Sequence, residues 1–317
     1  MSGDGRFTHQ PVLVDLVVEL FAPVPPGVVV DATVGGGGHA EALLDAHAHL
    51  SLVGMDQDPD AAAAAEGRLR RFGDRVTVRH GRFDRLAAVL RDLGHDRASG
   101  ALFDLGVSSP QLDRPERGFS YRVAGPLDMR MDPTRHVTAA DLVNGAEASE
   151  LARLLRAYGD ERHAARIAAA IVAARPVTST DQLAAVVRDA VPAAARRRGG
   201  HPARRTFQAI RIAVNDELAV LPASLDAALD LLVPGGRCVA LAYHSGEDRI
   251  VKQRFRHAAA GGWTGPSHLP TPPDVRPTVR LLRRGAWRPS ADEVAANPRA
   301  EAARLRAVEK LPLPEVA

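Results

Sequence analysis

Three aspartates in the first third of the chain each follow a short apolar run. They are Asp31, Asp56 and Asp104. Val-rich runs of this length are typical of buried parallel strands, and ligands of a parallel sheet bind beyond the carboxyl ends of its strands. Because burying an unpaired charge is costly, core packing does not explain three carboxylates at strand ends. The spacing therefore predicts a ligand site lined by carboxylates.

A glycine loop follows the first of these aspartates directly. Residues 31–40 read Asp-Ala-Thr-Val-Gly-Gly-Gly-Gly-His-Ala, and a helix-forming run continues to Ala48. Glycine tolerates positive φ and lets a ligand approach the backbone, and the first turn of a helix offers unpaired N–H groups. Four glycines exceed what a tight turn requires. The stretch predicts a nucleotide-type site built from a strand, a loop and a helix.

Three ligands compete for this loop. A Walker A loop needs Gly-Lys-Ser/Thr after the glycines, and that sequence is absent. A dinucleotide fingerprint fits loosely through Gly35, Gly37 and Ala40, with Asp56 placed for a ribose. A site for S-adenosylmethionine (SAM) is favoured over one for NAD, because Asp31 would repel a pyrophosphate but attract the ammonium and sulfonium of SAM.

The alternation of strand-like and helix-like runs predicts an α/β protein with a doubly wound, mostly parallel sheet. About 130 residues separate Asp104 from the next clear strand, residues 237–243, where a crossover needs far fewer. Helical periodicity fills much of this interval. We therefore expect a Rossmann-like core at residues 1–127 and 202–317, and a small helical domain inserted at 128–201.

Composition limits the remaining possibilities. The chain has 317 residues and 45% apolar residues, enough for a sizeable core. It contains no apolar run of membrane-spanning length, and the polar N-terminus lacks a signal core, so we expect a cytoplasmic protein with no membrane partner. The single cysteine, Cys238, fits a reducing compartment. The histidines show no metal-ligand spacing with it, so no metal site is expected.

Several further motifs lie in order along the chain. They are Asp104-Leu-Gly-Val-Ser-Ser-Pro-Gln-Leu-Asp113, Arg117-Gly-Phe-Ser120, Gly125-Pro-Leu-Asp-Met-Arg-Met-Asp-Pro133, His201-Pro-Ala-Arg-Arg-Thr-Phe-Gln-Ala-Ile-Arg211, Val214-Asn-Asp-Glu-Leu218, His244-Ser-Gly-Glu-Asp-Arg-Ile-Val-Lys252 and Asn297-Pro-Arg-Ala300. Together they closely resemble the bacterial 16S rRNA (cytosine-N4)-methyltransferase family, also called the MraW family. The resemblance runs from residue 9 to residue 310. It implies that the Rossmann-like core is that of a SAM-dependent methyltransferase, and that the inserted helical domain serves substrate recognition.

This resemblance implies a SAM-dependent enzyme that methylates the exocyclic N4 of one cytidine in the decoding centre (P-site region) of 16S rRNA, in the small ribosomal subunit. The SAM contacts of the family carry over onto Gly37, Gly38, His39, Asp56, Phe83, Asp104 and Gln111. The sequence departs from the usual pattern at Ala32, Val34, Tyr243 and Gly246, and none of these is a carried-over contact.

Methyl transfer from a sulfonium is an in-line displacement, so positioning should dominate catalysis. The N4 amine is a poor nucleophile, and acceptors for its N–H bonds would free its lone pair. Amino-methyltransferases are known for an Asn/Asp/Ser-Pro-Pro-aromatic motif, which Ser109-Pro-Gln111 matches in part. The catalytic candidates are Ser108, Ser109, Asp104 and His244. Methylation at carbon 5 would need a cysteine thiolate, and Cys238 lies within a predicted strand, which favours the amine.

The densest basic cluster predicts contact with RNA phosphates. It comprises Arg196, Arg197, Arg198, Arg204 and Arg205. The alternatives are an enzyme of the same fold acting on DNA amines, an assembly factor that binds RNA without catalysis, and, more distantly, a nicotinamide oxidoreductase. The sequence leaves open whether the protein is a monomer or a homodimer, and which group accepts the amine proton.

Overall fold

The chain folds into two compact units in this computed structural model, which describes residues 11–196, 200–263 and 275–312. One unit combines residues 1–106 with 220–317, and the other is the continuous stretch 107–219. The first holds the β-sheet and is called the sheet unit below. The second is built of helices and is called the helical unit.

The sheet unit contains a seven-stranded sheet of order β3-β2-β1-β4-β5-β7-β6 in the described part of the chain. The strands are β1 (Gly27–Asp31), β2 (Leu50–Asp56), β3 (Val76–His80), β4 (Ala98–Asp104), β5 (Leu232–Ala242), β6 (Val279–Leu281) and β7 (Arg304–Lys310). Strands β1 to β5 are parallel, while β7 runs antiparallel between β5 and β6. This confirms the predicted α/β, Rossmann-like fold with a doubly wound, mostly parallel sheet.

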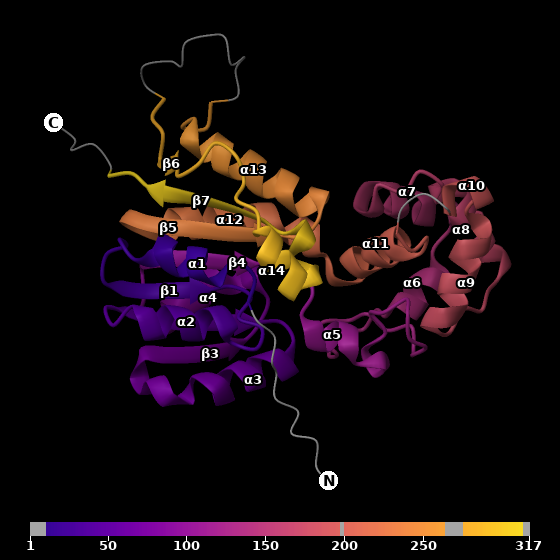
Figure 1. The fold of residues 1–317 in the computed structure, drawn as a ribbon, viewed down its shortest axis with the longest axis horizontal. Coiled ribbons are helices and arrows are strands. Elements are labelled where there is room, and N and C mark those ends of the chain that lie inside the picture. Colours follow the sequence, from indigo (N-terminus) through magenta and orange to yellow (C-terminus); the bar gives the residue numbers. More distant parts are fainter. Residues whose placement is uncertain (1–10, 197–199, 264–274, 313–317) are drawn as a thin grey trace. The chain divides into compact units, whose positions relative to one another are not determined.

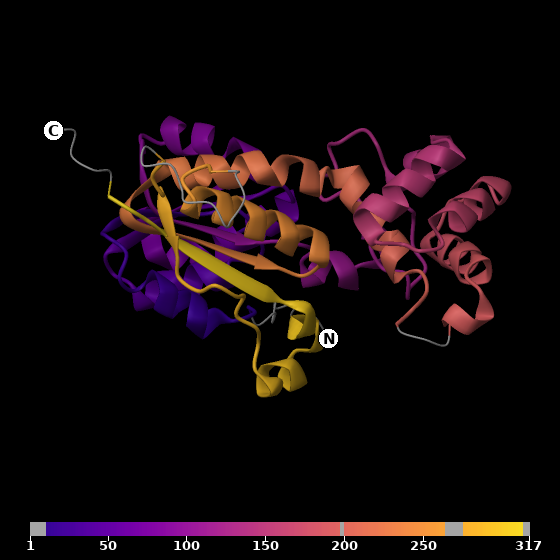
Figure 2. The same ribbon diagram turned by 90° about the horizontal axis from the view of Figure 1, so that it is seen from above.

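Helices cover both faces of this sheet (Figure 1). They are α1 (Val14–Phe21), α2 (Gly38–Ala46) and α3 (Pro59–Leu69) on one face, and α4 (Leu86–Asp92), α12 (Glu217–Leu231) and α13 (Ser245–Ala259) on the other. Figure 2 shows the indigo helices on one side of the sheet and α12 and α13, in orange, on the opposite side. Because both faces are covered, Val29 and Val30 are fully buried, as their continuous apolar run predicts.

Parallel pairing brings the strand ends to one edge. Asp31 is in register with Leu102 of β4 and with Gly54 of β2, so β1 ends beside both neighbours. Strands β2 and β4 each continue for two residues beyond these partners, to Asp56 and Asp104. The three aspartates therefore lie at the carboxyl edge of adjacent strands.

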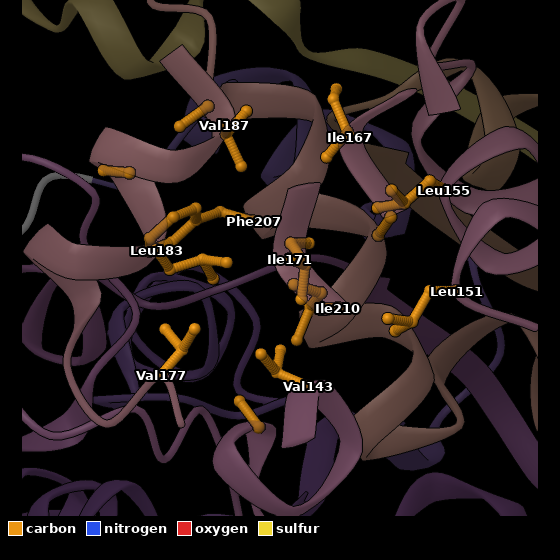
Figure 3. Close-up of a cluster of buried hydrophobic side chains, with 14 of the residues drawn as sticks. Val143, Leu151, Leu155, Ile167, Ile171, Val177, Leu183, Val187, Phe207 and Ile210 are labelled. Carbon is orange, nitrogen blue, oxygen red and sulfur yellow. The ribbon is translucent and has the colours of Figure 1, made fainter. Parts of the chain in front are cut away.

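The helical unit has a core of its own (Figure 3). Its helices are α5 (Ser109–Asp113), α6 (Ala139–Gly145), α7 (Ala148–Gly159), α8 (Ala164–Ala173), α9 (Thr180–Ala190), α10 (Ala193–Arg196) and α11 (Arg204–Asn215). Phe207 and Ile210 of α11 are buried with Leu155, Ile171 and Leu183 of three other helices. Apolar residues at helical spacing supply this core, as their periodicity predicts.

The division between the units differs from the expected boundaries at residues 128 and 201. Residues 107–127 belong to the helical unit, because Phe119 and Leu127 are buried in its core. Helix α11 also packs there, against α7. Asp216, in the left-handed conformation (φ 54°), separates α11 from α12. No helix in the described residues is long and apolar enough to cross a membrane.

Candidate active site

The glycine loop after β1 is tied to the ends of two strands through Thr33. The Thr33 N–H donates to Asp31 Oδ1 at 3.2 Å, and the Thr33 Oγ1 accepts the Asp104 N–H at 2.6 Å. Asp31 is only 1% exposed. The loop thus holds the ends of β1 and β4 together.

Asp56 anchors the same loop from the end of β2. Its Oδ2 accepts the Gly35 N–H and its Oδ1 accepts the Asp58 N–H, both at 2.9 Å. Gly35 (φ 52°) and Gly37 (φ 80°) both have left-handed conformations, which explains why glycine occupies these positions. Each Asp56 oxygen keeps a further lone pair for a ligand hydroxyl.

A second network surrounds Asp104. The Tyr243 hydroxyl donates to Asp104 Oδ1 at 2.7 Å, and His39 Nδ1 lies 3.4 Å from Asp104 Oδ2. His39 Nε2 lies 2.9 Å from the Val12 carbonyl oxygen, which can only accept, so this nitrogen carries a proton. Both ring nitrogens of His39 therefore face acceptors.

Burial and charge shift the pKa values of this group of residues. Burial raises the pKa of Asp31 to about 7, although the nearby His39 opposes the shift. Burial also raises the pKa of Asp56 to about 6. For His39, burial lowers the pKa, but the hydrogen bond and charge of Asp104 outweigh it and the net shift is upward. Burial and the charge of Asp104 raise the pKa of Tyr243, so its phenol keeps its proton. Carboxylates whose ionisation is suppressed by burial favour a cationic ligand.

A third glycine of the loop, Gly38, is closely packed. A Cβ on Gly38 would lie 2.6 Å from Cγ of Pro11, closer than a side chain can normally approach. The close packing therefore favours glycine at this position. Phe83 is 7% exposed and packs edge-on against Phe103 with ring centroids 5.9 Å apart. Its role toward a cofactor stays a prediction.

His244 caps helix α13. Its Nδ1 accepts the N–H groups of Gly246 and Glu247, at 3.2 and 3.4 Å. The Glu247 side chain, 2% exposed, accepts the Tyr243 N–H at 2.7 Å and lies 3.0 Å from His244 Nε2. The cap thus fixes the backbone of Tyr243, and a substrate-side role for His244 stays a prediction.

Ser108, Ser109 and Gln111 belong to the helical unit. Gln111 Oε1 accepts the Ser108 N–H at 3.0 Å, and the two residues form a capping box for α5. The buried Ser109 Oγ has no hydrogen-bond partner within the described part of the chain. Their roles in catalysis and SAM binding stay predictions.

The predicted basic cluster also belongs to the helical unit. Arg196 ends α10, and Arg204 and Arg205 begin α11 with exposed side chains. Arg205 Nη1 donates to the Asp160 carbonyl oxygen at 3.1 Å. Arg197 and Arg198 lie outside the described residues.

The structure thus gathers Asp31, Asp56, Asp104 and His39 around one glycine loop. Tyr243 and Thr33 were not among the residues predicted for the site. The position of Tyr243 directly before the His-Ser motif was the available signal for it. Cys238 is fully buried within β5, and burial raises the pKa of its thiol. The described residues contain no group of three or more side chains suited to hold a metal ion.

The class of protein is a Rossmann-like methyltransferase. The sheet is doubly wound, a glycine loop follows β1, and carboxylates end β1 and β2. The sequence model of the MraW methylase family matches residues 6–311, so the chain belongs to this family. This confirms the family predicted from the motifs, and with it SAM as the cofactor.

Curated relatives agree with this membership. The chain is 54% identical over 309 residues to ribosomal RNA small subunit methyltransferase H of Thermobifida fusca, covering 95% of this chain and 93% of that protein. It is 57% identical over 309 residues to the protein of the same name from Acidothermus cellulolyticus, covering 96% and 94%. A solved structure, an rRNA methylase from Streptococcus thermophilus, aligns with a TM-score of 0.41 at 12% identity, covering 94% of this chain and 94% of that one.

Proposed function

We propose that this protein transfers a methyl group from SAM to the exocyclic N4 of a cytidine in the decoding centre of 16S rRNA, within the small ribosomal subunit. The names of the curated relatives, which are small subunit rRNA methyltransferases, support the substrate class. The resemblance stated above supplies the position on the base.

The observation that carries the proposal is the set of three carboxylates tied to one glycine loop. Residues present there fit SAM, because Asp31 has a pKa raised to about 7 and gains from a cationic partner. Asp56 is held by two backbone N–H groups with lone pairs left for ribose hydroxyls. When bound, SAM supplies an electrophilic methyl group on its sulfonium.

The protein's own contribution is positioning. Tyr243 donates to one oxygen of Asp104 and His39 lies beside the other, so this carboxylate cannot turn freely beside the loop. Glu247 fixes the Tyr243 backbone in turn. A fixed carboxylate at a strand end can orient reactants without reorganising during the reaction, which is the main requirement of an in-line displacement.

The choice of the amine over ring carbon 5 is supported by Cys238. Attack on the ring needs a thiolate at the base, and this thiol is buried in β5 with a raised pKa. Ser108 and Ser109 are the proposed acceptors for the amine N–H bonds. Arg196, Arg204 and Arg205 are proposed to contact RNA phosphates, since their side chains carry fixed charges.

Nucleoside mass spectrometry tests the proposal. Purified protein and SAM are incubated in parallel with small subunits lacking the modification, naked rRNA and plasmid DNA. We expect N4-methylcytidine in rRNA, and its loss in Asp104→Ala. Methylated DNA would favour the DNA-directed alternative, and SAM binding without methylation of any substrate would favour an assembly factor.

A further inference from the structure

Helix α13 packs alongside β6 and β7 (Figures 1 and 2). Two hollows lie in this part of the sheet unit. The first has a volume of about 200 Å³, and its lining includes Tyr243, His244, Arg288 and Arg304. The second is smaller and is lined by basic residues of α13 and of the segment after β6, which are Lys252, Arg256, Arg283 and Arg284. We call this surface the α13–β7 groove.

One ion-pair cluster joins the two hollows. Arg304 and Arg306 lie two residues apart on β7, so their side chains point to the same face. Both reach Asp248 of α13: Arg306 Nε at 2.8 Å from Oδ1, and Arg304 Nη1 at 3.5 Å from Oδ2. Arg304 also lines the first hollow and Arg306 the second. The hollows are therefore parts of one continuous surface.

Most cations along this groove have no carboxylate to neutralise them. Within the described ranges, no ion pair is formed by Lys252, Arg256, Arg283, Arg284 or Arg288. The arginines around them differ: Arg254 pairs with Asp226, while Arg237 and Arg280 both pair with Glu309. Glu301, in the first hollow, is the acidic residue among the lining side chains. The groove thus carries an excess of positive charge.

The spacing of these charges fits a chain of phosphates better than a single anion. The stretch of α13 from Ser245 to Arg256 rises about 16 Å at 1.5 Å per residue. Guanidinium groups match phosphate oxygens with paired hydrogen bonds, and phosphate contacts supply much of the affinity for nucleic acid. Arg256, Arg284 and Arg288 are exposed, so they are accessible to such a ligand.

One end of the groove reaches the carboxylate site. Tyr243 lines the first hollow, and its hydroxyl donates to Asp104 Oδ1 at 2.7 Å. A strand lying in the groove would therefore end at the carboxyl edge of β4 and β5, where methyl transfer is proposed.

We propose that the α13–β7 groove binds the sugar–phosphate backbone of the RNA substrate next to the target nucleotide. This rests on the proposed function, because it takes small-subunit rRNA as the ligand. The groove is a second RNA-binding surface, on the sheet unit, distinct from the arginines of the helical unit.

The test compares Arg284→Gln/Arg288→Gln with wild type in filter binding to a 16S rRNA transcript over a range of NaCl concentrations. Removing one phosphate-binding cation should lower the slope of log affinity against log salt by about 0.7 to 0.9, so the double variant should show a slope smaller by about 1.5. Arg85→Gln/Arg91→Gln is the matched control, since both residues are exposed and neither forms an ion pair in the described structure. It should keep the wild-type slope.

SAM binding by calorimetry and the unfolding midpoint should be unchanged in both double variants, which separates RNA contact from misfolding. An unchanged slope and affinity in Arg284→Gln/Arg288→Gln, with wild type binding normally, would overturn the groove proposal alone. Wild type that neither binds nor methylates rRNA would instead overturn the proposed function. Normal binding to naked rRNA with impaired methylation of assembled subunits would mean that the groove contacts a ribosomal protein, and would also overturn it.

Discussion

Affinity for SAM should depend steeply on pH because of Asp31. Burial raises the pKa of this carboxyl to about 7, and the groups that face it are His39, Asp104 and Asp56. With a pKa of about 7, roughly 90% of Asp31 is ionised at pH 8 but only about 3% at pH 5.5. If the cationic ligand needs the carboxylate, the apparent Kd is the intrinsic value divided by the ionised fraction.

The expected change is therefore a loss of about 30-fold in affinity from pH 8 to pH 5.5, or about 2 kcal/mol. Asp56, with a pKa of about 6, adds a further factor of about 4. A protonated His39 acts in the same direction, since a cationic ring beside the loop repels a cationic ligand. Affinity should accordingly rise with pH and level off above pH 8.

Isothermal titration calorimetry at several pH values measures this profile for wild type and for Asp31→Asn. Asp31→Asn should bind SAM more weakly than wild type at pH 8. It should also lose the part of the pH dependence of SAM affinity, about 30-fold, that ionisation of Asp31 contributes. Adenosine, which lacks both cationic groups of SAM, is the control ligand and should not show the Asp31 dependence. If the SAM affinity of wild type and of Asp31→Asn changed with pH by the same factor, the reasoning that Asp31 provides the negative charge for SAM would be refuted.

Further predictions concern stability and catalysis. Asp31→Asn should raise the free energy of unfolding of the unliganded protein above pH 7, by up to about 4 kcal/mol. In the folded state Asp31 has a pKa of about 7, whereas in the unfolded state it has the ordinary pKa of 3.8. The free energy of unfolding of wild type should therefore fall as the pH rises from 3.8 to about 7. Urea unfolding at several pH values measures this. Tyr243→Phe should lower stability by about 1 kcal/mol, because Asp104 loses a hydrogen bond, and chemical denaturation would show whether it does. Ile171→Ala should cost about 2 to 5 kcal/mol and speed hydrogen exchange across residues 107–219; unchanged exchange there would contradict a packed core. Cys238→Ala should leave the rate of methyl transfer unchanged, and loss of transfer in a folded variant would argue for attack on the ring.

Much of the sheet unit could be predicted because its signals are local. The glycine loop directly follows the Val28–Val30 run and Asp31, and Asp56 and Asp104 each end an apolar run of their own. Parallel pairing then places the three aspartates at one edge. The contact between Tyr243 and Asp104 joins residues far apart in the chain, so no local sequence pattern predicts it. Residues 107–127 have no clear periodicity, which is why the helical unit begins earlier than expected.

The α13–β7 groove was missed for a related reason. Its cations are spread from Lys252 to Arg304, and they form no cluster in the sequence comparable to the one at 196–205. They come together only because β7 returns antiparallel beside β5 and under α13. The direction of a final strand depends on tertiary packing, which a single sequence does not specify.

The position of β7 in the chain also bears on how the protein is made. Strand β5 pairs with both β4 and β7, and β5 and β7 both follow the helical unit in the chain. The helical unit is one continuous stretch, so it can complete its core while these later strands are still being translated. The sheet is complete only after β7 has been synthesised, and the groove and the surroundings of Tyr243 form with it. A nascent chain would thus present a finished helical unit before it could present a complete catalytic edge.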